Sequence, residues 1–413
     1  MSKYICFILL FGVVMQVSAQ RHEIFDENIA SLQVVANSDW QSLPLIQLGK
    51  GFVNVSFDDL THEYHRYMYR LQHCDADWSV SEDLFESEYC EGFASGNTID
   101  DVKESLLTNQ LYTHYSLQLP NNRCNITMSG NYKLVVYDDN NYEKPILSAC
   151  FMVAENVMGV GLNVSSNTDV SINQQHQQVA MELNYNGINV NNPYTQIKTV
   201  VLQNSRWDDA RWNAPPQYIM PTGLKWEHNR SLIFSAGNEY RKFEILSTDV
   251  ASMGIEKIRW DGEEFHAYPF VSLPRQNYIY DEDANGAFLL RNSDNADSEF
   301  MSDYMNVHFI LQSPQRFDSE VYVNGNFTHD SFLPAYRMKY DDATQTYEAI
   351  VKLKLGYYSY QFLLVDSQGR VHTVPSEGSF YQTENTYQAL VYYREQGGRT
   401  DRLVGYRQVS SRQ

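Results

Sequence analysis

Hydrophobic and polar residues alternate in short runs along most of this chain. Alternation of period two turns one face of an extended segment toward a core and the other toward solvent, so these runs predict β-strands. The runs are separated by segments rich in Gly, Asn, Asp and Pro, which are typical of turns. The clearest predicted strands are residues 67–71, 132–137, 179–185, 307–311, 321–323 and 347–355.

Amphipathic helical periodicity is scarce, and only residues 102–109 suggest a short helix. Short strands joined by turns favour β-sandwiches over alternating β and α units. We therefore predict an all-β protein with two or three immunoglobulin-like or early-set β-sandwich domains in tandem.

The first residues predict export from the cytoplasm. Lys3 precedes an apolar run over residues 4–14, and Val17-Ser18-Ala19 forms a small-residue cleavage site, so residues 1–19 are predicted to be a signal peptide. The run is shorter than the roughly 20 apolar residues that a membrane span needs. The residue directly after the cleavage site is Gln20 and not a cysteine, so nothing suggests lipid attachment there. We expect an exported protein that is not inserted in a membrane.

Composition divides the rest of the chain. The acidic and polar segment 292–301 is the best linker candidate, and the polar stretch 163–178 suits a connection or an exposed loop. The predicted units are an N-terminal β-sandwich over 20–155, a middle β domain over 156–291, the acidic linker over 292–301, a third sandwich over 302–394 and a polar tail over 395–413.

The charge excludes one class of partner. The chain has 51 Asp and Glu against 31 Lys and Arg, which gives a net charge of −20 and a pI near 4.9. Such a surface repels phosphate backbones and anionic headgroups, so nucleic acid is not an expected partner.

Four cysteines follow the predicted signal peptide, namely Cys74, Cys90, Cys124 and Cys150. In an oxidising compartment they allow two disulfides with three possible pairings. Buried free thiols are the alternative, because cysteine also packs as a small apolar side chain. The spacing does not suit zinc.

Two segments carry metal-ligand residue types without the full pattern. In residues 62–65 one residue separates Glu63 from His65, whereas a zinc protease helix needs two, so a solvated turn is favoured. Asp281, Asp283 and Asn285 match the first half of a calcium loop, but Asn292 stands where a bidentate Glu belongs. A turn is again the favoured interpretation, and no cofactor is predicted.

Local catalytic motifs are missing from the sequence, while a pair of acids for glycoside cleavage stays open as an alternative because such carboxylates need be close only in space. Cys74 lies between His73 and acidic residues, which disfavour a reactive thiolate, so a structural corner with Trp78 packed beneath it is expected. There is no G-x-S-x-G and no phosphate-binding glycine loop. We predict a binding protein and not an enzyme.

The C-terminal strands, with the turn at residues 325–326, resemble the early-set sandwich of glycogen-binding modules. In those modules exposed aromatic side chains stack on sugar rings, which makes Tyr358 and Tyr360 candidate sugar contacts. The alternative is that both tyrosines belong to the core of the sheet.

Many short segments together resemble the plug protein family of the type IX secretion system of Bacteroidetes. The resemblance covers nearly the whole chain after the signal peptide. The segments are residues 56–60, 73–78, 87–89, 92–93, 112–115, 119–121, 129–132, 151–153, 275–277, 281–286, 303–304, 356–358, 383–385 and 403–406.

This resemblance implies a periplasmic protein without a catalytic centre. It would bind the outer-membrane translocon barrel of the secretion system and close the periplasmic opening of that barrel. The residues that contact the barrel are not identified by the sequence. The alternative function is a carbohydrate-binding envelope protein with weak glycan binding through its third domain.

Overall fold

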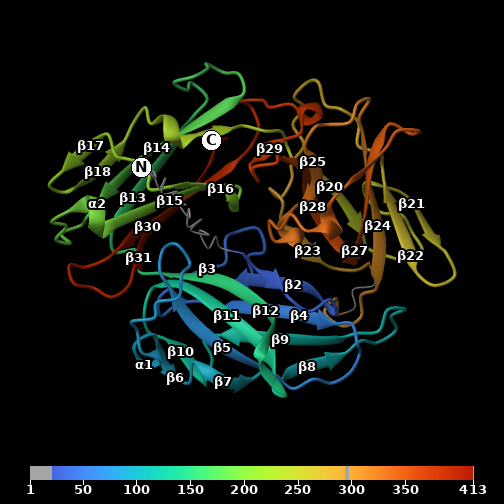
Figure 1. Cartoon of the computed structure of the whole chain (residues 1–413), viewed down its shortest axis with the longest axis horizontal. Coiled ribbons are helices and arrows are strands. Elements are labelled where there is room, and N and C mark those ends of the chain that lie inside the picture. Colours follow the sequence, from blue (N-terminus) through green and yellow to red (C-terminus); the bar gives the residue numbers. More distant parts are fainter. Residues whose placement is uncertain (1–20, 294–296, 413) are drawn as a thin grey trace, which may run out of the picture.

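The computed structural model describes residues 21–293 and 297–412. The fold is all-β, and its sheets pack as three sandwiches (Figure 1). The N-terminal sandwich lies at the bottom of that view, the middle one at the upper left and the third at the upper right. The predicted signal peptide lies outside the described residues.

The N-terminal sandwich packs two main sheets around one core. The larger sheet has the order β1-β12-β11-β5-β7, with β3 paired to β12: β1 (Glu23–Ile24), β3 (Leu45–Gln47), β5 (Tyr67–Cys74), β7 (Ser95–Thr98), β11 (Gly130–Asp138) and β12 (Asn141–Ala154). The facing sheet has the order β2-β4-β9-β8: β2 (Ile29–Ala36), β4 (Val53–Asp59), β8 (Asp101–Glu104) and β9 (Thr113–Leu119). A small sheet of β6 (Cys90–Gly92) and β10 (Cys124–Ile126) follows the short helix α1 (Glu86–Tyr89).

The middle sandwich combines central and C-terminal segments of the chain. One sheet has the order β13-β14-β18-β17, with β19 paired to β14: β13 (Gly159–Ser165), β14 (His176–Asn184), β17 (Tyr218–Met220), β18 (Gly223–Trp226) and β19 (Ile233–Ser235). The other has the order β16-β15-β30-β31: β15 (Ile197–Gln203), β16 (Arg206–Trp212), β30 (Thr386–Tyr393) and β31 (Arg402–Ser410). The short helices are α2 (Pro193–Gln196) and η1 (Arg230–Leu232).

The third sandwich is built around the long strand β28. In its first sheet β28 (Gly356–Val365) pairs with four strands: β20 (Arg241–Ile245), β23 (Phe288–Leu290), β25 (Glu320–Asn324) and β29 (Val371–Thr373). The second has the order β21-β22-β24-β27-β26: β21 (Ile255–Trp260), β22 (Phe265–Pro269), β24 (Tyr304–Gln312), β26 (Lys339–Asp341) and β27 (Thr346–Lys354). Three short 3₁₀ turns are η2 (Asn326–Thr328), η3 (Pro334–Tyr336) and η4 (Pro375–Glu377).

The strand pairing corrects the predicted domain limits. Strand β15 of the middle domain pairs with β30, so residues 386–410 complete the middle sandwich. The supposed polar tail from residue 395 contains β31, and the limit at 394 is therefore wrong. Strands β20 to β23, placed before residue 291, belong to the third sandwich through β28 and β24. The limit at 291 fails because sheet partners are chosen in space and not by order along the chain.

The six clearest strands predicted from alternation are confirmed as β5, β11, β14, β24, β25 and β27. The helix suggested at residues 102–109 is wrong, because residues 101–104 form β8, an edge strand paired to β9. The stretch 163–178 is a loop only in its centre, since its ends belong to β13 and β14.

Candidate functional site

The predicted sugar-contact residues lie in the core of the third sandwich. Tyr358 is 1% exposed and Tyr360 is 4% exposed, and the ring of Phe243 stacks on that of Tyr358. A buried ring cannot stack on a sugar, so the prediction for these two tyrosines is wrong. Strand β28 is covered on both faces, which alternation alone does not indicate.

The segment 281–286 is a self-bonded turn. Asp283 accepts hydrogen bonds from the amides of Tyr240 and Asn285, each at 2.5 Å, while the carboxylate of Asp281 pairs with Lys242. Burial raises the pKa of Asp283 to about 7. The carboxylates are thus used by the protein itself. Within the described ranges, no group of three or more His, Cys, Asp or Glu side chains could hold a metal ion.

The corner predicted at residues 73–78 is confirmed as a structural element, and it joins two domains. Trp78 is buried, and its ring meets that of Trp207 from the middle domain edge to face at 5.5 Å. The carboxylate of Asp75 accepts hydrogen bonds from the Thr400 hydroxyl at 2.7 Å and from Arg394 at 2.6 Å. The loop between β30 and β31 is therefore fixed to the N-terminal domain.

A second polar network joins the N-terminal domain to the third. The Lys354 ammonium and the Asp58 carboxylate are 2.6 Å apart, and their side chains are 0% and 1% exposed. The Asp58 carboxylate also bonds the hydroxyl of Tyr304 and the imidazole of His114, each at 2.6 Å. Burial alone would raise the pKa of Asp58, but Lys354 and His114 hold that pKa below its ordinary value. The pair is charged and shielded from water, which makes each partner depend on the other.

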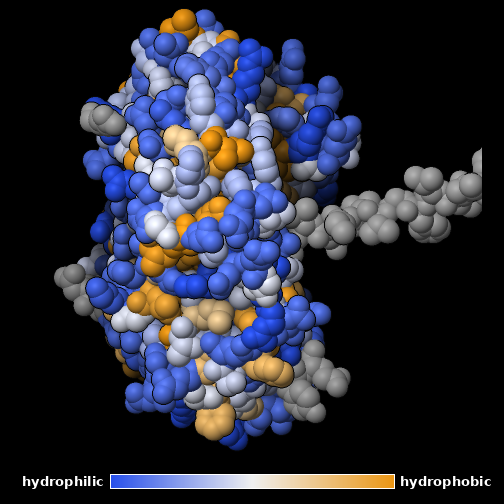
Figure 2. All heavy atoms as spheres, turned by 90° about the vertical axis from the view of Figure 1, so that its left-hand side faces the viewer, coloured by the Kyte–Doolittle hydropathy of each residue, from blue (hydrophilic) through white to orange (hydrophobic). Residues whose placement is uncertain are grey.

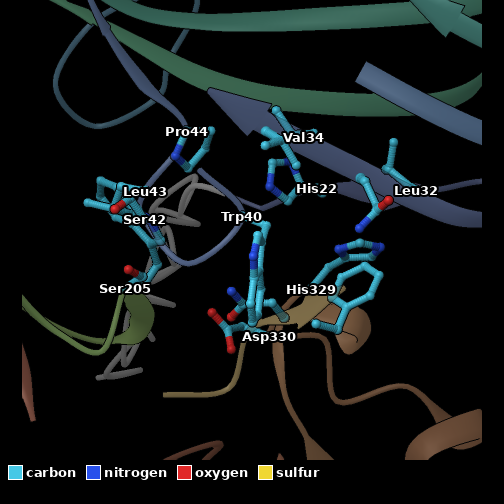
Figure 3. Close-up of a pocket in the computed structure, with 15 residues that line it drawn as sticks. His22, Leu32, Val34, Trp40, Ser42, Leu43, Pro44, Ser205, His329 and Asp330 are labelled. Atoms are coloured by element: carbon cyan, nitrogen blue, oxygen red, sulfur yellow. The ribbon is translucent and has the colours of Figure 1, made fainter. Parts of the chain in front are cut away.

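The three domains meet around a cavity of about 80 Å³ (Figure 3). Trp40 enters it from the loop after β2, and its ring approaches Tyr357 of the third domain at 5.9 Å. Ser205 lines it from the middle domain, and His329 and Asp330 from the third. Ligand pockets usually enclose roughly 300–1,000 Å³. The cavity is therefore too small for a substrate and serves as a joint between domains.

Two imidazoles meet edge to face in this joint. The ring centroids of His22 and His329 are 5.5 Å apart, and the Nδ1 of His22 accepts a hydrogen bond from the Cys150 amide at 3.0 Å. Burial lowers the pKa of His22 to about 3 and that of His329 to about 4. Both rings are neutral at neutral pH, and protonation would place a charge between packed domains.

Acid should weaken this joint through His329. The unfolded chain binds a proton near pH 6.5 that folded His329 binds only near pH 4, so stability is lost as pH falls between these values. Lowering the pH from 7.5 to 4.5 should therefore reduce the free energy of unfolding of the wild type by about 2 kcal/mol more than that of His329→Gln. Urea unfolding at both pH values measures it.

The matched control is His228→Gln, because the His228 side chain is 86% exposed. His228 pairs with Asp169 at the surface (2.9 Å), and exposed pairs of this kind contribute little to stability, so this substitution should change the stability far less than His329→Gln at both pH values. His329 has a left-handed backbone (φ 54°), and the cost of placing Gln there is the same at both pH values. Parallel pH profiles for the wild type and His329→Gln would contradict the prediction.

The sequence predicted the corner at 73–78. It did not indicate the cavity or the contacts that the two networks make between domains. Their residues come from segments far apart in the chain, and each is an ordinary strand or turn residue locally.

The exposed surface adds one further feature. On the face in Figure 2, hydrophobic side chains gather in small groups with polar side chains between them.

The fold and these joints define an all-β protein of three sandwich domains that are fixed to one another by buried polar contacts. Residues 29–155 match the family model described as type 9 secretion system plug protein 1st domain. The chain belongs to this plug protein family, which associates it with the type 9 secretion system of the cell envelope. Across the described part of the chain, none of the helices is long and apolar enough to cross a membrane.

A solved structure agrees over the full length. The crystal structure of a hypothetical protein from Parabacteroides merdae ATCC 43184 is 38% identical and superposes with a TM-score of 0.92, covering 96% of this chain and 100% of that one. Collagen adhesin from S. aureus is 7% identical over 93% of this chain and 92% of its own, and its TM-score of 0.12 carries no argument. No curated protein matches the sequence.

Proposed function

We propose that this protein is a periplasmic plug that binds the outer-membrane translocon of the type 9 secretion system and closes its periplasmic opening. The observation that carries the proposal, together with the family, is the fixing of the three domains by buried polar contacts. The Asp58–Lys354 pair and the Asp75 corner hold the N-terminal domain to both others. A body fixed in this way can cover an opening without deforming, and the role needs no catalytic residues.

The contact surface is proposed on the domain that matches the plug family. Phe85 and Phe93, on either side of α1 and β6, are 73% and 71% exposed. Arg399, from the loop between β30 and β31, bonds Glu88 and the carbonyl of Asp83, so this corner is held in place. Exposed aromatic side chains on a fixed support are typical binding hot spots. The scattered hydrophobic groups of Figure 2 suit an interface that is fairly polar and able to release.

Deletion of the gene should open the outer membrane to large solutes while the translocon is still made. A cap contributes closure and not chemistry, so its loss leaves a wide pore unsealed. The deletion strain should become sensitive to antibiotics and dyes that the outer membrane excludes. Measuring dye entry and minimal inhibitory concentrations checks this, and restoring the gene should reverse both effects.

Co-purification with the barrel tests the contact surface. The wild-type protein should co-purify with the resting translocon, and the double variant Phe85→Ser with Phe93→Ser should lose this binding at least tenfold. The control is Tyr194→Ser, a substitution of an equally exposed ring (72%) in the middle domain, which should bind normally. Unchanged permeability on deletion, together with no barrel recovered under gentle extraction, would exclude the plug function.

A further inference from the structure

The corner that carries α1 holds two cysteines on neighbouring strands. In the antiparallel pair of β6 and β10, Cys90 lies opposite Ile126 and Cys124 lies opposite Gly92. The two cysteines are thus diagonal neighbours on the same face of the pair. Their sulfurs are 2.6 Å apart, and both side chains are buried. They are free thiols in this structure, at a separation close to the bonding distance of about 2.05 Å.

Gly92 lets the two strands come this close. Its φ is +104°, which favours glycine, and a Cβ there would lie 2.2 Å from the carbonyl oxygen of Arg123. Any side chain at this position would push β10 away from β6. The glycine opposite Cys124 therefore keeps the two sulfurs within reach of each other.

The other two cysteines cannot form a bond with each other. Cys74 is on β5 and Cys150 is on β12, and β11 lies between them, pairing Asn131 with Cys74 and Lys133 with Cys150. Two strand spacings separate their Cα atoms by about 9.5 Å or more. A disulfide requires Cα atoms within about 7 Å. Burial raises the pKa of both thiols to about 12, which keeps them protonated and unreactive.

We propose that Cys90 and Cys124 form a disulfide in the exported protein, and that Cys74 and Cys150 remain thiols. The oxidant is a protein or small-molecule disulfide in the periplasm. One cysteine thiolate attacks one oxidant sulfur and displaces the other oxidant sulfur as a thiolate. The thiolate of the second cysteine then attacks the first cysteine's sulfur in the mixed disulfide and displaces the remaining oxidant sulfur as a thiolate. Two protons and two electrons leave the protein, and the oxidant is reduced to a dithiol.

The order in which the two thiolates attack does not change the product, since either order yields the same disulfide. Because both sulfurs are buried in the folded domain, the bond forms before the corner packs. The disulfide links two positions 34 apart in the sequence and fixes α1 to the edge of the N-terminal sandwich. The proposal rests on the periplasmic location but not on binding to the translocon.

Mass spectrometry of full-length protein from the native periplasm tests the pairing. The denatured, unreduced protein is treated with N-ethylmaleimide and digested. We expect label on Cys74 and Cys150 and a linked peptide pair that contains Cys90 and Cys124. Label on all four cysteines, or a linkage that includes Cys74 or Cys150, would overturn the proposal.

A thermal measurement gives a second test. Reductant should lower the Tm of the wild type by about 5–10 °C. The control Cys74→Ser should show the same fall, and Cys124→Ser should show none. If Cys124→Ser does not fold, the peptide mapping of the wild type decides alone. A protein that carries the Cys90–Cys124 bond but does not bind the translocon overturns only the proposed function.

Discussion

Replacing Lys354 with methionine will lower the free energy of unfolding by about 3–5 kcal/mol. Lys354 and Asp58 are both fully shielded from water, and the carboxylate also organises Tyr304 and His114. Without the ammonium, the buried charge of Asp58 depends on its hydrogen bonds to Tyr304 and His114, or the carboxylate takes up a proton at a cost. Urea unfolding at pH 7.5 measures the change.

Two comparisons distinguish this effect from a general loss of packing. The double variant Lys354→Met with Asp58→Asn removes both charges together and should recover most of the lost stability. Arg337→Met removes an exposed pair with Glu320 and should cost less than about 1 kcal/mol. A Lys354→Met protein within about 1 kcal/mol of the wild type would show that the buried pair does not hold the domains together.

A fragment over residues 237–384 will fold by itself, whereas one over residues 302–394 will not. The longer fragment contains every strand of the third sandwich and all the residues of its core. The shorter one lacks Phe243, Ile245, Ile255 and Phe288. At about 1.5–3 kcal/mol for each buried side chain, the loss is about 6–12 kcal/mol, which matches the whole net stability of a typical domain.

The shorter fragment also lacks strands that pair with β28 and with β30. Residues 356–360 of β28 pair with β20 on one side, and β23 pairs with residues 356–358. The shorter fragment keeps β30 without its neighbours β15 and β31, so an apolar strand with free edges is exposed. Circular dichroism and thermal melting should show a cooperative transition only for the longer fragment. Cooperative unfolding of the shorter fragment would contradict the observed strand pairing.

Local sequence was sufficient for the elements and the family. Alternation located β5, β24 and β27 because buried residues alternate with more exposed ones along them. Strands β11 and β25 were also located, although both of their faces are largely buried. The acidic residues after Cys74 favoured a structural corner, and the buried Trp78 lies at that corner. The plug family was indicated by short segments spread over the chain, and the match over residues 29–155 confirms it.

Partner choice between strands was decided only by the tertiary structure. The sequence places β30 and β31 after the third sandwich, but their hydrogen bonds go to β15 of the middle domain. No local pattern encodes this, because an edge strand accepts any neighbour of suitable register and burial. The cavity of His22, Trp40 and His329 arises from the same long-range packing.

Lys354 shows the physical reason most directly. In β27 the residues Ala349, Val351 and Leu353 point to the core, so alternation places Lys354 on the solvent face with Lys352. Lys352 is exposed as expected, but Lys354 is completely buried because the N-terminal domain covers that end of the strand and supplies Asp58. The sequence determined which face of each strand turns away from its own core. Only the packing of one domain on another decided which of those faces meets water.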